Sequence, residues 1–194
     1  MDNIQEIREI IDPGKSVLVI WDVQKMLVNN IFNREEFLEN TNQLIESARQ
    51  KRIPIFFTKI TPLPEAFQLP ANKFFMKNRA RGINFAPEGL ELAIEPKKND
   101  IVINKNTANI FIGTNFELMI RNANLSTLIF SGIATEMGVE SSARDARNRG
   151  FFPVIVTDAV SSSDQEAHSR SLQNLKNMMV LLTSKDIISI WNAD

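Results

Sequence analysis

The sequence of 194 residues contains no cysteine, no tyrosine and only one histidine, His168. The absence of cysteine excludes disulfides, thiolate metal ligands and catalysis by a thiol. A single histidine cannot build a metal site that needs several imidazoles, so we expect no catalytic metal and no other cofactor. His168 falls in a predicted helix, far from the predicted strand ends, and we expect it to be a packing or surface residue.

The chain also has little net charge and no long apolar run. Its 22 Lys and Arg residues nearly balance its 23 Asp and Glu residues, which gives a formal net charge of -1. No global field therefore favours nucleic acid or an anionic membrane. No apolar run approaches the ~18 residues of a membrane span. The acids near the N-terminus stand where a signal peptide would be apolar, so we expect a cytoplasmic protein.

Short apolar runs alternate with amphipathic stretches along the whole chain. This pattern predicts a mostly parallel sheet with helices on both faces, and the length favours one domain, residues 1–194. Six strands are expected at residues 17–21, 53–58, 101–103, 127–131, 152–156 and 179–182. Helices are expected at residues 35–51, 114–122, 137–149, 163–177 and 184–191. We therefore predict an α/β fold: a three-layer, Rossmann-like α/β/α sandwich.

Sequence signals mark where two of these helices begin. Ser163 and Glu166 have the spacing of a capping box, in which the serine and the glutamate satisfy two backbone donors reciprocally. Ser184 is expected to cap the last helix.

The segment from residue 61 to 96 is irregular and contains several prolines and a basic stretch. A connection of this length without clear structure is often a lid or a binding loop. Arg79 and Arg81 are candidates to bind a substrate carboxylate. In the alternative, this stretch is a solvated basic loop.

Candidate catalytic side chains follow the predicted strands directly, where ligands bind in open parallel sheets. Asp22 comes after the first strand, and a poorly solvated carboxyl there could act as a general acid or base. In the alternative, Asp22 only caps the turn. Lys105 follows the third strand and could set the charge state of Asp22, or it could be a solvated lysine at a strand exit.

A turn at residues 132–138 joins the fourth strand to a helix. Backbone N–H groups at such a helix start can bind an oxyanion or a carboxylate. Ala134, Thr135 and Met137 in this turn are therefore candidates for substrate binding. In the alternative, Gly132 and Gly138 are present only for backbone reasons.

Together these motifs resemble the isochorismatase-like, or cysteine hydrolase, superfamily. The motifs are Asp-Val-Gln at 22–24, lysine at 105, Gly-Ile-Ala-Thr-Glu at 132–136 and Ala-Arg-Asp-Ala at 143–146. The resemblance runs from about residue 17 to 182. It implies a catalytic Asp at Asp22, a catalytic Lys at Lys105 and a non-proline cis peptide near Ala134 and Thr135. It also implies a homo-oligomer and a small-molecule substrate. The phenylalanine-rich part of the irregular segment offers further apolar surface in favour of an oligomer, at Phe67, Phe74, Phe75 and Phe85.

The resemblance places the usual cysteine nucleophile at Gly138, which has no side chain. The isochorismatases proper are similar: they keep the Asp and Lys, carry Gly at this position and hydrolyse a vinyl ether with the Asp as general acid. The resemblance thus implies a hydrolase that works without a thiol. This chain departs from that branch at Ala134 and Thr107, where polar or aromatic groups are common. The alternative is a catalytically silent member that binds a ligand or serves as an oligomeric subunit.

Overall fold

The computed structural model describes residues 2–71, 73–74 and 86–193. Arg79 and Arg81, the two predicted substrate-binding arginines, lie outside the described residues. Within the described part of the chain, no helix is long and apolar enough to cross a membrane.

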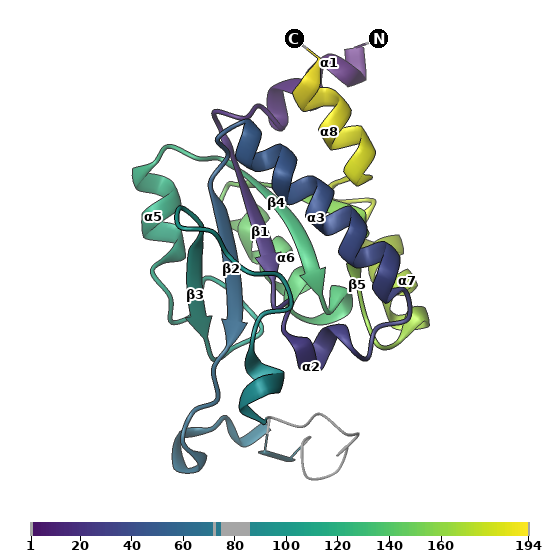
Figure 1. Cartoon of the computed structure of the whole chain (residues 1–194). Helices are drawn as coiled ribbons and strands as arrows, with labels where there is room; N and C mark the ends of the chain where they lie inside the picture. Colours follow the sequence, from purple (N-terminus) through teal and green to yellow (C-terminus); the bar gives the residue numbers. More distant parts are fainter. Residues whose placement is uncertain (1, 72, 75–85, 194) are drawn as a thin grey trace.

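Six parallel strands form one sheet in the order β3-β2-β1-β4-β5-β6 (Figure 1). Every pairing is parallel, so the predicted fold class is confirmed. The order reverses between β1 and β4, which run side by side in the middle of the sheet. The strands are β1 (Ser16–Trp21), β2 (Ile55–Ile60), β3 (Ile101–Lys105), β4 (Thr127–Ile133), β5 (Phe152–Ser161) and β6 (Val180–Leu182).

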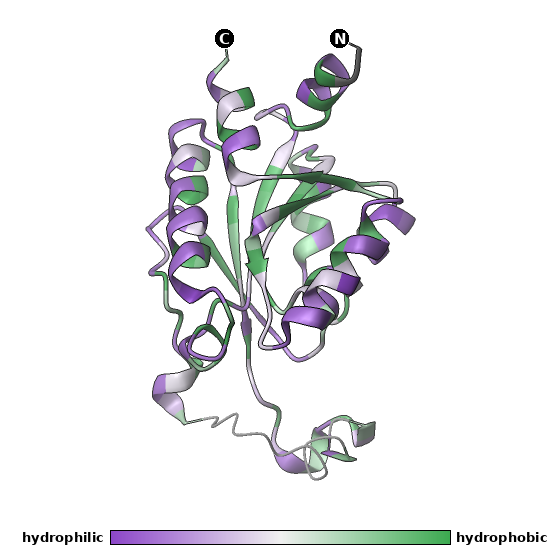
Figure 2. Ribbon diagram, turned by 90° about the vertical axis from the view of Figure 1, so that its right-hand side faces the viewer, coloured by the Kyte–Doolittle hydropathy of each residue, from purple (hydrophilic) through white to green (hydrophobic). Residues whose placement is uncertain are grey.

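Helices cover both faces of the sheet, as the view along its edge shows (Figure 2). The α-helices are α1 (Asp2–Ile10), α2 (Lys25–Val28), α3 (Arg34–Gln50), α5 (Phe116–Asn122), α6 (Glu140–Asn148), α7 (Gln165–Leu175) and α8 (Ser184–Asn192). Short helical turns are η1 (Glu65–Phe67), η2 (Pro87–Leu90) and the π-helical turn η3 (Thr135–Val139).

Each face of the sheet has its own core, because side chains along a strand alternate between the two faces. In β1, Leu18 and Ile20 pack toward α3 and α8, whereas Val17, Val19 and Trp21 pack toward α5, η3 and α6. All six residues of β1 are buried, as expected for a strand covered on both sides. The candidate site lies on the face that is covered by α5, η3 and α6.

Several helix boundaries differ from the sequence prediction. The N-terminal helix α1 and the short α2 were not predicted. Asp164, not Ser163, caps α7 by accepting a hydrogen bond from the Ala167 N–H at 2.9 Å. Thr183, not Ser184, caps α8 and forms a capping box with Asp186. A carboxylate or hydroxyl one position away satisfies the same backbone donors, so spacing alone did not fix the capping residue.

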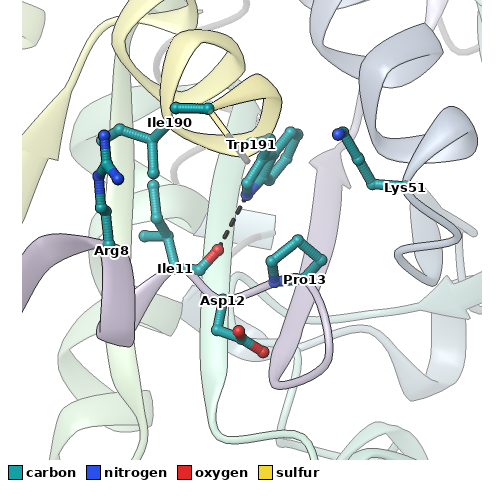
Figure 3. Close-up of a pocket in the computed structure, with 8 residues that line it drawn as sticks. Arg8, Ile11, Asp12, Pro13, Lys51, Ile190 and Trp191 are labelled. Carbon is teal, nitrogen blue, oxygen red and sulfur yellow. Dashed lines mark hydrogen bonds between the residues drawn. The ribbon is translucent and has the colours of Figure 1, made fainter.

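A pocket of about 320 Å³ lies at the amino ends of the strands, opposite the candidate site (Figure 3). It lies beside α1 and α8, near both chain termini. The indole N–H of Trp191 donates to the Ile11 carbonyl at 2.9 Å and closes one wall. Arg8 and Lys51 also line the pocket.

The phenylalanine-rich segment that suggested a homo-oligomer is only partly described. Phe67 and Phe74 are 74% and 63% exposed, whereas Phe75 and Phe85 lie outside the described residues. The homo-oligomer stays a prediction.

Candidate active site

The candidate site lies at the carboxyl edge of the sheet, where the strand order reverses. Trp21, the last residue of β1, pairs with Gly132 of β4. A Cβ at Gly132 would lie 2.1 Å from the Trp21 carbonyl oxygen, and its φ is +124°, so only glycine fits there. Asp22 then leaves the strand with a φ of 47°, a conformation that Asp adopts more readily than most residues.

Asp22 is held by hydrogen bonds to both of its carboxylate oxygens. The Thr58 hydroxyl of β2 donates to Oδ1 at 2.6 Å, and the Lys105 ammonium of β3 donates to Oδ2 at 2.6 Å. The Asp22 backbone N–H donates in turn to Thr58 Oγ1 at 3.0 Å. The side chains of Asp22 and Lys105 are only 3% and 1% exposed. The structure therefore brings the two predicted catalytic residues into direct contact.

Burial changes the pKa values of both members of this pair. Loss of hydration raises the pKa of the Asp22 carboxyl above its ordinary 3.8, against the opposing effects of Lys105 and Thr58. Burial also lowers the pKa of the Lys105 ammonium below 10.5, against the opposing effect of Asp22. Both shifts have the same cause, because a charged group is costly to bury. A raised carboxyl pKa suits a group that must carry a proton near neutral pH.

The Lys105 ammonium has three partners, as many as it has N–H donors. Besides Asp22, it donates to the Thr107 carbonyl at 3.1 Å. It also lies 4.1 Å from the ring centroid of Trp21, a cation–π contact. Lys105 is therefore a charge partner of Asp22, and it is not a solvated lysine.

The indole of Trp21 fills the space next to Gly138, the predicted nucleophile position. A Cβ added at Gly138 would lie 2.1 Å from Trp21 Nε1 and 2.3 Å from Cε2. Real Cβ atoms do not approach a rigid ring so closely. A side chain at position 138 and the indole at position 21 therefore exclude each other in this arrangement.

The turn after β4 contains the other predicted binding residues. The peptide bond between Ile133 and Ala134 is cis, next to the predicted position. Ala134 is half-buried, Thr135 is buried, and the Met137 side chain is 61% exposed. The Ala134 carbonyl accepts hydrogen bonds from the Met137 and Val139 N–H groups, at 3.2 and 3.3 Å. The Met137 amide is thus already paired within the turn.

His168 contacts this turn, which corrects its predicted place far from the strand ends. Its Nδ1 lies 2.9 Å from Thr135 Oγ1, and the Thr135 hydroxyl donates to the Ser161 carbonyl at 3.1 Å. Because that hydroxyl proton is used, Nδ1 of His168 is the donor to Thr135. Burial lowers the pKa of His168 below 6.5. His168 is thus a packing residue, and Thr135, which it contacts, belongs to the turn of the candidate site.

Two residues of the site, Thr58 and Trp21, were not singled out from the sequence. A signal was available: two-residue alternation places Thr58 on the same face as Phe56, and Lys105 on the same face as Ile103. Trp21 lies on that face with Val17 and Val19. The alternation therefore points Trp21, Thr58 and Lys105 at one another across three neighbouring strands.

No group of three or more His, Cys, Asp or Glu side chains that could hold a metal is found among residues 2–71, 73–74 and 86–193. The metal-free site stays a prediction. What the arrangement offers chemically is one buried carboxyl with a cationic partner, beside an indole and a backbone turn.

Comparisons with known proteins agree with this geometry. The model of the isochorismatase domain matches residues 16–186. Isochorismatase family protein YwoC of Bacillus subtilis (strain 168) is 30% identical over 169 residues, which cover 84% of this chain and 86% of that protein. Ureidoacrylate amidohydrolase RutB of Pseudomonas syringae pv. syringae is 25% identical over 201 residues, covering 90% and 82%.

A solved structure shows the same fold. A cysteine hydrolase from Pseudomonas syringae pv. phaseolicola superposes with a TM-score of 0.84 at 16% identity, covering 95% of each chain. At that identity the likeness concerns the fold. The family match extends over most of the chain and includes Asp22, Lys105 and the turn before α6. The chain therefore belongs to the isochorismatase family of hydrolases.

Proposed function

We propose that this protein hydrolyses a small vinyl ether of the isochorismate type, with Asp22 as general acid and without a covalent intermediate. The observation that carries the proposal is the filling of the predicted nucleophile position by the Trp21 indole, beside an intact Asp22–Lys105 pair. A thiol route has no room at position 138. The Asp22 carboxyl, held by Lys105 and Thr58, is the acid–base group next to that filled position.

In the proposed reaction, the Asp22 carboxyl transfers its proton to the methylene carbon of the vinyl ether. The electron pair of the double bond forms the new C–H bond and leaves an oxocarbenium ion. Water adds to this cation and returns one proton to the Asp22 carboxylate. The resulting hemiketal collapses to a keto acid and an alcohol, so one water is consumed and Asp22 ends protonated.

The contacts of Asp22 suit both stages of this cycle. Burial favours the protonated carboxyl before the reaction. Once the proton has left, the Lys105 ammonium at 2.6 Å and the Thr58 hydroxyl at 2.6 Å stabilise the carboxylate. Burial thus favours the proton-carrying form of the acid, and its conjugate base is stabilised when the proton moves.

The second candidate is a silent family member that binds a ligand or serves as an oligomeric subunit. The near-complete burial of Asp22 and Lys105 favours it. Loss of either residue would leave the other as an unpaired buried charge, so the pair is retained for stability even without catalysis. Amide hydrolysis, the activity in the name of the RutB relative, is the third outcome to test.

The test measures pyruvate release from isochorismate and ammonia release from simple amides by the same preparation. The proposal expects pyruvate without ammonia, and no burst that would report a covalent intermediate. Ammonia release without pyruvate would replace the vinyl-ether proposal with an amidase. Ligand binding with neither product would overturn the vinyl-ether proposal and leave a silent member or an enzyme with another substrate.

A further inference from the structure

We propose that the indole N–H of Trp21 is a hydrogen-bond donor to a substrate oxygen, placed where the family's nucleophile would stand. Trp21 would thus be a specificity-determining residue that selects ligands with a carboxylate or carbonyl oxygen. The identity of that ligand as the substrate rests on the function proposed above, whereas the donor role itself does not.

The first observation is the position of the indole edge. Of the atoms that a Cβ at Gly138 would meet, Trp21 Nε1 is the nearest, at 2.1 Å, ahead of Cε2 at 2.3 Å and Cζ2 at 2.5 Å. Trp21 Nε1 therefore lies in the space that a side chain at position 138 would need. A donor occupies the place where a nucleophile would have been.

The second observation is that this donor has no partner in the protein. Trp21 is only 1% exposed as a residue. Within the described part of the chain no hydrogen bond of its Nε1 is found, yet Nε1 is not among the fully buried atoms left without a partner, so the little exposure of this residue includes its N–H. Buried polar groups are nearly always hydrogen-bonded, and a buried Trp usually finds an acceptor for its N–H. Trp191, the other tryptophan, follows that rule by donating to the Ile11 carbonyl at 2.9 Å. An unpaired donor beside a general acid points to a ligand that supplies the acceptor.

The third observation is that the face and the edge of the Trp21 ring make different contacts. The ring face receives the Lys105 ammonium at 4.1 Å, which completes the three partners of that cation. Lys105 therefore has no N–H left for a substrate. The indole edge lies in the ring plane, away from this contact, and its N–H stays available.

These contacts define the chemical class of the ligand. A neutral N–H next to a charge-balanced Asp22–Lys105 pair donates to an oxygen lone pair and offers no site for a cation. Small carboxylates, including keto acids and enol ethers with a carboxylate, meet this requirement.

The test follows the two indole N–H resonances by NMR in isotope-labelled protein, assigned with Trp191→Phe. Pyruvate and benzoate are titrated into the wild type, and isochorismate into Asp22→Asn, which keeps Trp21. We expect the Trp21 resonance to move downfield with these carboxylates and the Trp191 resonance to stay in place. A Trp21 resonance that no probe moves overturns the donor role, even if isochorismate is turned over. A moving resonance without turnover keeps the donor and overturns the proposed function.

Two substitutions separate the edge of the ring from its face. Trp21→Phe keeps an aromatic face for Lys105 but removes the N–H, so we expect KM to rise about three- to ten-fold with an unchanged pH profile. Trp21→Leu removes both, so the pH profile should shift as well. An unchanged KM in Trp21→Phe would contradict the donor role, and benzoate binding measured by calorimetry gives the same comparison without turnover.

Discussion

The edge of the Trp21 indole lies against the backbone of Gly138, so that a Cβ at position 138 would meet Nε1 at 2.1 Å. The indole of Trp21 at the end of β1 therefore fits only because Gly138 in η3 has no side chain. A cysteine at position 138 would therefore also require a smaller residue at position 21. The Trp21–Gly138 pair also keeps the aromatic face against Lys105, which links packing to the charge state of Asp22.

Adding a side chain at Gly138 should therefore destabilise the fold. We expect Gly138→Ala and Gly138→Cys to lower the free energy of unfolding by about 1–3 kcal/mol, because the rigid indole must move. Urea denaturation measures this loss. Gly14→Ala is the control, since a Cβ there meets only the Asp12 carboxylate at 3.1 Å.

The same pair should show strong coupling in a double-mutant cycle. In a Trp21→Val background, the cost of Gly138→Cys should nearly disappear, a coupling of about 1–3 kcal/mol. The Trp21→Val change itself is costly because it empties a buried site, so the coupling is the quantity to compare. Additive effects of the two substitutions would show that the indole does not occupy the space at position 138.

Removing Lys105 should leave a stranded buried charge. We expect Lys105→Met to lower the free energy of unfolding by about 3–5 kcal/mol near neutral pH. The loss should shrink as the pH falls, because the Asp22 pKa is already raised by burial and protonation removes the unpaired charge. Urea denaturation at several pH values follows this change.

Two control variants test the cause of that loss. Asp22→Asn in the Lys105→Met background should restore much of the stability, because no buried charge then remains. Lys25→Met breaks an ion pair with Glu91 whose side chains are 49% and 58% exposed, and it should have a much smaller effect. An equal loss in Lys25→Met would mean that burial of the Asp22–Lys105 pair has no special cost.

His168 should make the turn at Thr135 sensitive to acid. Its folded pKa lies below the ordinary 6.5 because of burial, so the unfolded chain binds a proton more readily than the folded one. Stability is then fully present above about pH 6.5 and falls as the pH drops toward the folded pKa. Thermal unfolding should show a steeper loss between pH 7.5 and 5.5 in the wild type than in His168→Gln. The same slope in both proteins would contradict this role.

Much of the fold was predictable because its main signals are local. Buried β-branched runs, helical spacing and strand ends carry the sheet and its helices, and they place Asp22 and Lys105 at one edge. The helices α1 and α2 escaped prediction. α1 carries isoleucines at helical spacing, at residues 4, 7 and 10, so a signal was present there. α2 has only four residues, too few to show a period.

The site was predictable only where its contacts follow from strand order. Asp22 and Lys105 could be paired because parallel strands end at one edge. The Trp21–Gly138 contact depends on how η3 packs against β1, more than a hundred residues apart in sequence, and no local pattern reports such packing. The position of His168 against Thr135 has the same origin, since α7 is brought to the turn only by the folded sheet.

The pH dependence of kcat for pyruvate release from isochorismate, with wild type and Asp22→Asn side by side from about pH 5 to 8, tests the central claim most directly. The wild-type rate should fall as the pH rises through the raised pKa of Asp22, because only the protonated carboxyl donates. Asp22→Asn should lose about 10²- to 10⁴-fold in kcat and show no such dependence, with circular dichroism confirming that the variant is folded. An Asp22→Asn protein that keeps the wild-type rate and pH profile would contradict the role of Asp22 as the acid.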